Sequence, residues 1–73
     1  MQRYLFQIQM SYAECQDMYQ QQIRYVVVHT HLGKTVRLPK ENLRPFLLPD
    51  GIYGQFELIT DANNKIKSLK KLN

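Results

Sequence analysis

Apolar and polar side chains alternate along the first ten residues of the chain. Tyr4, Phe6, Ile8 and Met10 share one parity, and the positions between them are mostly polar. A period of two is typical of a strand that buries one face and leaves the other partly in water. We therefore expect a half-buried strand from Arg3 to Met10.

A helical period replaces this alternation after the tenth residue. Ser11 and Glu14 form the S-x-x-E pattern, in which the serine oxygen accepts from a backbone amide and the carboxylate reaches back. The pattern predicts a helix from Tyr12 to Gln21. Its expected apolar stripe has helical spacing and consists of Tyr12, Cys15, Met18 and Tyr19.

The segment from Ile23 to Thr30 is the most strongly strand-forming part of the chain. One face carries Ile23, Tyr25 and Val27, and the other carries two further valines. A strand with two apolar faces needs cover on both. We expect the preceding helix to cover the second face, and a homodimer contact is the alternative. A turn at His31–Lys34 then opens a hairpin.

The hairpin's second strand is expected at Lys34–Leu38, and sharp turns must follow it. The Pro39–Phe56 segment holds all three prolines and two of the three glycines. Because the residue before a proline is biased away from helix, we expect one helical turn, at Lys40–Leu43. Leu43 and Phe46 should point inward, and the Pro-Asp-Gly sequence that follows should form a tight turn.

Two more strands are expected after this segment. Ile52–Ile59 alternates, with Tyr53 and Ile59 facing outward, and its internal Gly54 indicates a bulge or a close backbone approach. A turn, which is indicated by its turn-forming residues, separates this strand from a last strand at Lys65–Leu72. Ile66 and Leu69 in that strand have opposite parity, so we expect a bulge or a change of face.

The assembled pattern predicts one domain, residues 1–73, of class α+β. The order is strand, helix, hairpin, proline-rich turn, hairpin. About five strands and one helix predict a small, strongly bent antiparallel sheet or an open barrel like that of SH3 domains, the latter by analogy alone. A chain of 73 residues buries only about 60% of its unfolded surface, so its stability should be modest.

The charge and the cysteine count indicate the cellular compartment and the possible partners. The chain carries a net charge of +4 and a single cysteine, Cys15. It therefore has no internal disulfide, which fits a reducing compartment. No stretch has the pattern of a membrane span or a secretory signal, so we expect a cytoplasmic protein that does not bind membranes. The basic excess permits binding to nucleic acid or to an acidic partner.

The sequence lacks the motifs of catalysis and cofactor binding. It contains neither a dinucleotide-binding nor a phosphate-binding glycine loop, and we expect no enzyme and no cofactor. Cys15 falls on the apolar stripe and is expected to be a core residue. His29 and His31 could share one face of a strand, but zinc needs three or four ligands. We therefore predict no metal site.

Two sets of surface residues are candidates for function. The first is an interaction surface in which Arg44 grips an anion beside Phe46, with Tyr53 and Ile59 facing outward; the simpler alternative is a hydrophobic plug with a locally paired arginine. The second is a basic stripe for phosphates, whose alternative is the lysine protection that edge strands use against unwanted pairing. The stripe consists of Lys34, Arg37, Lys65, Lys67, Lys70 and Lys71.

The chain resembles a family of short, uncharacterised bacterial proteins, a domain of unknown function of about this length. The resemblance spans nearly the whole chain and implies a shared fold and a bacterial cytoplasmic setting, but no activity. One departure is Gln20-Gln21, where a glycine that closes the helix is expected. The matching pieces are Arg3-Tyr4, Ser11-Tyr12-x-Glu14-Cys15, Tyr25-Val26-Val27-Val28, Leu43-Arg44-Pro45-Phe46, Gly51-Ile52-x-Gly54-x-Phe56, Asn63-Asn64-Lys65 and Ser68-Leu69.

Two functions follow as hypotheses. The first is a non-enzymatic protein-interaction or adaptor module, whose partner is another protein or a second copy of the chain. The second is binding of RNA or single-stranded nucleic acid through the basic stripe, with Tyr53 available for stacking. Phosphate binding must weaken steeply with salt, whereas an apolar interface need not.

Overall fold

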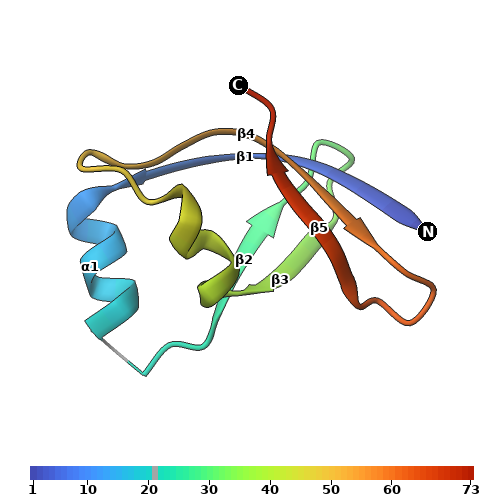
Figure 1. Cartoon of the computed structure of the whole chain (residues 1–73), viewed down its shortest axis with the longest axis horizontal. Coiled ribbons are helices and arrows are strands. Elements are labelled where there is room, and N and C mark those ends of the chain that lie inside the picture. Colours follow the sequence, from blue (N-terminus) through green and yellow to red (C-terminus); the bar gives the residue numbers. More distant parts are fainter. Residues whose placement is uncertain (21) are drawn as a thin grey trace.

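The computed structural model describes residues 1–20 and 22–73 (Figure 1). The class is α+β, as predicted, and each strand lies within two residues of its expected bounds. The predicted last helical residue, Gln21, lies outside the described residues. The elements are β1 (Gln2–Ser11), α1 (Tyr12–Gln20), β2 (Tyr25–His29), β3 (Thr35–Pro39), the 3₁₀ helix η1 (Lys40–Phe46), β4 (Gly51–Thr60) and β5 (Ile66–Lys71).

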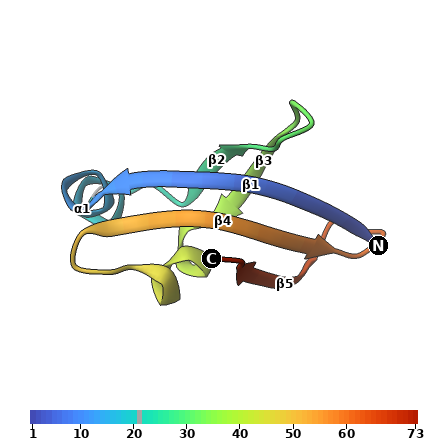
Figure 2. The ribbon, with the colours of Figure 1, turned by 90° about the horizontal axis from the view of Figure 1, so that it is seen from above.

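The strands form two antiparallel sheets that do not close into a barrel. One sheet has the order β1-β4-β5, and the other pairs β2 with β3. The sheets meet where Phe6 on β1 bridges Thr30 and where the backbone N–H of His31 donates to the carbonyl of Leu5 at 2.9 Å. Figure 2 shows the turn of the β2–β3 hairpin and β5 on opposite sides of the β1–β4 pair, with β3 crossing the pair. The two ends of this arrangement, β3 and β5, therefore remain apart.

The hydrophobic core lies against the inward faces of β1 and β4. Phe6 and Phe56 are register partners, and their rings stack with centroids 5.8 Å apart. Both are fully buried, and each such side chain contributes about 1.5–3 kcal/mol of transfer free energy. The alternation predicted for both strands is confirmed. The other core residues are Ile8, Cys15, Val28, Leu38, Leu43, Ile52 and Leu58.

The helix α1 begins with the predicted capping box. The backbone N–H of Glu14 donates to Ser11 Oγ at 3.2 Å, and the N–H of Ser11 donates to Glu14 Oε1 at 3.1 Å. Cys15 and Met18 are buried as expected, but Tyr12 is 45% exposed, so its predicted inward position is wrong. At about 100° per residue, Tyr12 lies roughly 60° from Cys15 and 120° from Met18. It therefore falls at the margin of the buried stripe.

The segment after β3 is a longer helix than predicted. Instead of one turn at Lys40–Leu43, η1 runs through Pro45 to Phe46. Leu43 is fully buried, and the Phe46 ring meets the Phe56 ring edge-on, with centroids 5.2 Å apart and planes at 81°. We attribute the extra turn to this packing, which outweighs the local bias of the residue before a proline.

Two glycines of β4 occupy conformations that only glycine adopts readily. Gly51 closes the predicted tight turn, exchanging backbone hydrogen bonds of 2.8 and 2.9 Å with Leu48, at φ +125°. Gly54 has φ +140°, and a Cβ there would lie 2.7 Å from Lys71 Cε and 3.0 Å from the carbonyl oxygen of Asn73. The predicted close approach at Gly54 is therefore confirmed, and the approaching segment is the C-terminal end of the chain.

The last strand, β5, contains the predicted bulge. Thr60 on β4 pairs with Ile66 and Ile59 with Ser68, which leaves Lys67 as the extra residue. The bulge restores the same parity to the two apolar side chains of β5, so Ile66 and Leu69 both pack against the core.

Candidate functional site

The outer face of the β2–β3 hairpin carries exposed apolar side chains. Tyr25 is 48% and Val27 55% exposed, although Val28 on the opposite face is buried. The expectation that the helix covers this face is wrong, because α1 packs against β4 and β1 instead. The Arg37 guanidinium carbon lies 4.6 Å from the centroid of the Tyr25 ring, a cation–π contact across the strand pair. The face is therefore apolar with one cation at its centre.

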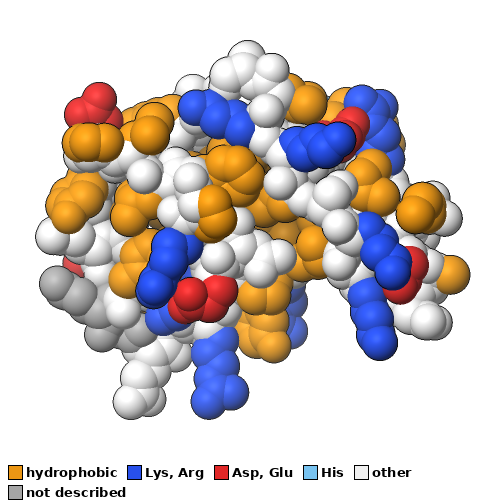
Figure 3. Space-filling model, viewed as in Figure 1, with side chains coloured by type: hydrophobic (Ala, Val, Ile, Leu, Met, Phe, Trp, Pro, Cys, Tyr) orange, Lys and Arg blue, Asp and Glu red, His pale blue; other side chains and the backbone are white. Residues whose placement is uncertain are grey.

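A notch separates β3 from β5 at the open side of the structure. Its volume is about 250 Å³, and Thr35, Val36 and Arg37 of β3 form one wall. Ile66 of β5 lies in the opposite wall. Figure 3 shows the molecular surface hollowed along its lower edge, with lysine or arginine side chains on both sides. The remaining lining residues are Tyr4, Leu58, Thr60 and Asn64.

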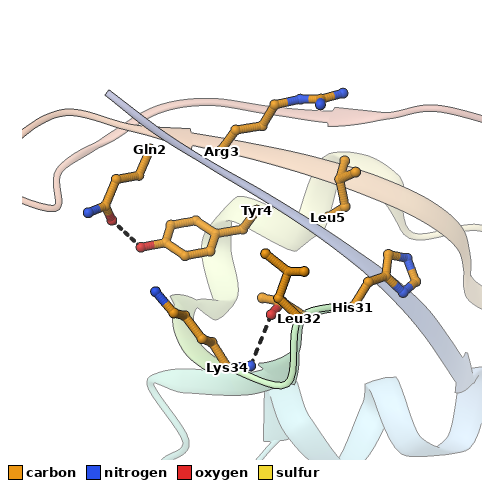
Figure 4. Close-up of a pocket in the computed structure, with 8 residues that line it drawn as sticks. Gln2, Arg3, Tyr4, Leu5, His31, Leu32 and Lys34 are labelled. Atoms are coloured by element: carbon orange, nitrogen blue, oxygen red, sulfur yellow. Dashed lines mark hydrogen bonds between the residues drawn. The ribbon is translucent and has the colours of Figure 1, made fainter.

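A second, larger hollow of about 440 Å³ lies between the start of β1 and the hairpin turn. Tyr4 and Leu32 point toward it with the Lys34 side chain, and the Tyr4 hydroxyl donates to Gln2 Oε1 (Figure 4). The turn is held by the backbone N–H of Lys34, which donates to Thr30 Oγ1 at 3.1 Å. Leu32 is 87% exposed, so this hollow is open to solvent.

The structure places Arg44 and Phe46 in different environments. Arg44 is exposed and pairs with Glu41 at 3.4 Å, and its guanidinium carbon lies 5.3 Å from the Tyr19 ring centroid. Phe46 packs on Phe56, as described above. The LRPF sequence therefore corresponds to the hydrophobic plug with a locally paired arginine. Phe46 is not a free contact residue, and Arg44 has neighbours of its own.

The other two candidate interaction residues lie on the outer face of β4. Tyr53 is exposed and pairs in register with Gln9. We expect Ile59 to face outward. Its side chain is half-buried, because it lies between Arg3 on β1 and Ser68 on β5. Tyr53 and Ile59 are six positions apart on one strand, so they do not form one compact patch with Arg44.

The six basic candidates do not form one stripe. Lys34 and Arg37 belong to the hairpin, and the others to β5 and the residue before it. Lys67 pairs with Asp61 at 3.9 Å, and Lys70 lies opposite Glu57, which already binds Arg3. Figure 3 shows the basic side chains in separate groups with acidic ones among them. The acidic neighbours lower the positive potential of β5.

The side chains with chemical reactivity differ in exposure, from the buried Cys15 to the exposed His29. Burial raises the pKa of the Cys15 thiol, which is almost fully inaccessible. Burial also raises the pKa of the Tyr19 hydroxyl, which donates to the carbonyl of Lys40 at 3.3 Å. His31 hydrogen-bonds Gln55 at 3.1 Å, and His29 is exposed. Across residues 1–20 and 22–73 no three histidine, cysteine or acidic side chains are grouped as metal ligands.

Sequence reasoning missed the notch and the buried threonine at its base. Thr60 is 4% exposed, and its Oγ1 has no hydrogen-bond partner among the described residues. Alternation places Thr60 on the inward face of β4, and that signal was available. The separation of β3 from β5 was not, because no local pattern reports the curvature of a sheet.

The fold and these surfaces define a small α+β domain with an open antiparallel sheet and exposed apolar and basic patches. The chain belongs to a family whose description is protein of unknown function (DUF2835), and the family model matches residues 2–72. The predicted family membership is thereby confirmed. No curated protein and no solved structure gives a match. In the described part of the chain, no helix is long and apolar enough to cross a membrane.

Proposed function

We propose that this domain is a non-enzymatic protein-interaction module that binds through the outer face of the β2–β3 hairpin. The observation that supports it is the exposure of Tyr25 and Val27 on a strand whose other face belongs to the core. Exposed apolar side chains grouped on one surface, with an arginine and a tyrosine, have the composition of an interface centre. A second copy of the chain is the first partner to test.

The structure offers less support for nucleic-acid binding, which stays the alternative. A continuous basic face would favour phosphates, but two of the β5 lysines have acidic neighbours. Tyr53 is exposed on the sheet's outer face, apart from Lys34 and Arg37 on the hairpin. Stacking and phosphate contact would therefore have to come from separate surfaces.

The proposal also includes the cellular location and the more detailed description of the fold. The single buried cysteine is compatible with the predicted bacterial cytoplasm, which fractionation of cells that express the protein would test. The bent, unclosed sheet is compatible with a barrel like that of SH3 domains, and an experimental structure would test this likeness.

Size-exclusion chromatography with light scattering tests the binding face. We compare Val27→Glu with Leu32→Glu, which adds the same charge at an exposed apolar residue on the hairpin turn. If the face is an interface, the wild type and Leu32→Glu form a dimer or retain a captured partner at both low and high salt. Val27→Glu should lose that association.

The same runs separate the two functions. Co-purifying nucleic acid that is shed at high salt, and lost in Lys67→Glu/Lys70→Glu, would favour the basic residues. The proposal is overturned if the wild-type protein is monomeric and Val27→Glu keeps the same partners as the wild type.

A further inference from the structure

The two end strands of the open sheet keep free backbone edges. Within the described residues, β3 is hydrogen-bonded only to β2, and β5 only to β4. A free edge presents unpaired N–H and C=O groups and can accept an added strand. The two edges differ, because β5 is interrupted by the bulge at Lys67 whereas β3 pairs in unbroken register with β2. The β3 edge is therefore the better template.

The notch beside β3 has the form of a site for an extended chain. Three consecutive β3 residues, Thr35 to Arg37, form its wall, so the strand lies along the notch rather than across it. Val36 and Ile66 provide apolar contacts on opposite sides. A side chain of an added strand that points inward would meet these two residues.

Thr60 at the notch supplies a second observation. Its hydroxyl is buried and has no hydrogen-bond partner among the described residues. Burying an unpaired hydroxyl costs free energy, and nothing in the core recovers that cost. Thr60 lines the notch, but its neighbours shield the Oγ1 atom, so a bound segment pairs with it only after those side chains move.

The charges around the notch select the partner. Arg37 lies in one wall and is the only charged residue among the described residues that line the notch. Lys65 and Lys67 are sequence neighbours of Ile66 outside the lining, and Lys67 pairs with Asp61, so the positive charge of the notch comes from Arg37. Two copies of this charge repel each other, whereas an acidic segment is attracted. The charge therefore disfavours a second copy of this chain at the notch.

We propose that the notch binds an extended acidic segment of a partner protein, which adds as a strand to the free edge of β3. Its aliphatic side chains contact Val36 and Ile66, and its carboxylates face Arg37. This site shares Arg37 with the outer face that carries Tyr25 and Val27, because the Arg37 guanidinium also lies over the Tyr25 ring. Val36, Ile66 and the free edge of β3 belong to the notch and distinguish it from that face.

Fluorescence anisotropy with labelled synthetic peptides tests the proposal on the full chain. The probe alternates glutamate and valine over eight residues. One control alternates lysine and valine, and another replaces the central valine of the probe by proline, which removes a backbone donor and fixes φ. We expect the probe to bind at least tenfold more tightly than either control. Equal binding of the proline peptide would overturn strand addition.

A pair of charge reversals locates the site. Arg37→Glu should weaken binding of the glutamate–valine peptide at least tenfold. Arg24→Glu, an equal change in net charge outside the notch, should weaken it less than threefold. If both variants lose affinity equally, the attraction is a general charge effect and the proposal fails.

Amide exchange measured by NMR supplies an independent readout. Binding should slow exchange at Thr35 or Arg37, because the backbone groups of these two residues point to the free edge, whereas Val36 already pairs with Val28 of β2. Slowing confined to Tyr25 and Val27 would place the peptide on the outer face and overturn the notch. If a single-stranded RNA displaces the peptide while exchange at Thr35 and Arg37 stays unchanged throughout, strand addition is also contradicted.

Discussion

Thr30 and Thr60 are both buried, but only the Thr30 hydroxyl has a hydrogen-bond partner. Thr30 Oγ1 accepts from the backbone N–H of Lys34 at 3.1 Å, whereas Thr60 Oγ1 has no partner among the described residues. The two residues therefore form a natural comparison between a satisfied and an unsatisfied buried hydroxyl.

The replacement of each threonine by valine should have opposite effects. Thr60→Val removes an unsatisfied polar atom and should raise the free energy of unfolding by about 1 kcal/mol. Thr30→Val leaves the N–H of Lys34 unpaired and should lower it by about 1–2 kcal/mol. Urea denaturation measures both. A loss of stability in Thr60→Val would show that its hydroxyl does have a partner in solution.

The glycine at position 51 should be irreplaceable. In Gly51→Ala the new Cβ would lie 2.0 Å from the carbonyl oxygen of Met10, at a φ of +125°. We expect a loss of at least about 3 kcal/mol, or failure to fold. Gly33→Ala is the control, because φ there is +82° with no atom within 4 Å, and it should cost about 1–2 kcal/mol. Equal losses in the two variants would contradict the close backbone approach at Gly51.

Of Arg44 and Phe46, only Phe46 should contribute appreciably to stability. Phe46→Ala removes the edge contact with Phe56 and should lower the free energy of unfolding by about 3 kcal/mol. Arg44→Ala removes only an exposed ion pair with Glu41 and should change it by less than about 0.5 kcal/mol. Thermal unfolding followed by circular dichroism distinguishes these results. A large loss in Arg44→Ala would assign Arg44 a structural role.

Asp61 should contribute to acid sensitivity. The backbone N–H of Lys65 holds the pKa of this carboxyl below its ordinary value, with further help from the N–H of Asn63 and from Lys67. A lowered folded pKa gives stability that is present above the ordinary value of about 3.9 and is lost as pH falls through the folded pKa.

Urea denaturation between pH 6 and pH 2 measures this dependence. Asp61→Asn, which keeps an acceptor oxygen but cannot titrate, should lose less stability than the wild type below about pH 4. Asp17→Asn, on the exposed face of α1, is the control. An acid response of Asp61→Asn that matches the wild type would rule out this contribution.

The secondary structure could be predicted from local patterns because each element carries its own signal. The capping box at Ser11, the parity of Phe6 and Phe56, and the bulge between Ile66 and Leu69 are all local, and the structure has them. Each depends on residues a few positions apart or on a regular period.

The surfaces were harder to predict because they depend on which elements come together. The two apolar faces of β2 indicate that another element covers the face that carries Tyr25, and α1 is the helix nearest to it in the sequence. The helix packs on β1 and β4 instead. The grouping of Arg44 with Tyr53 failed for the same reason, since chain proximity does not determine spatial proximity. The notch beside Val36 depends on sheet curvature, which no single strand encodes.

The bulge in β5 gives that strand one residue more than its pairing with β4 requires. Lys67 can be exchanged for other residues at little cost, because its side chain lies in solvent. Without it, Ile66 would lie two positions from Leu69, so regular alternation would keep both side chains against the core. We therefore expect deletion of Lys67 to leave the pairing of β4 with β5 intact, and related chains that lack this position can share the fold.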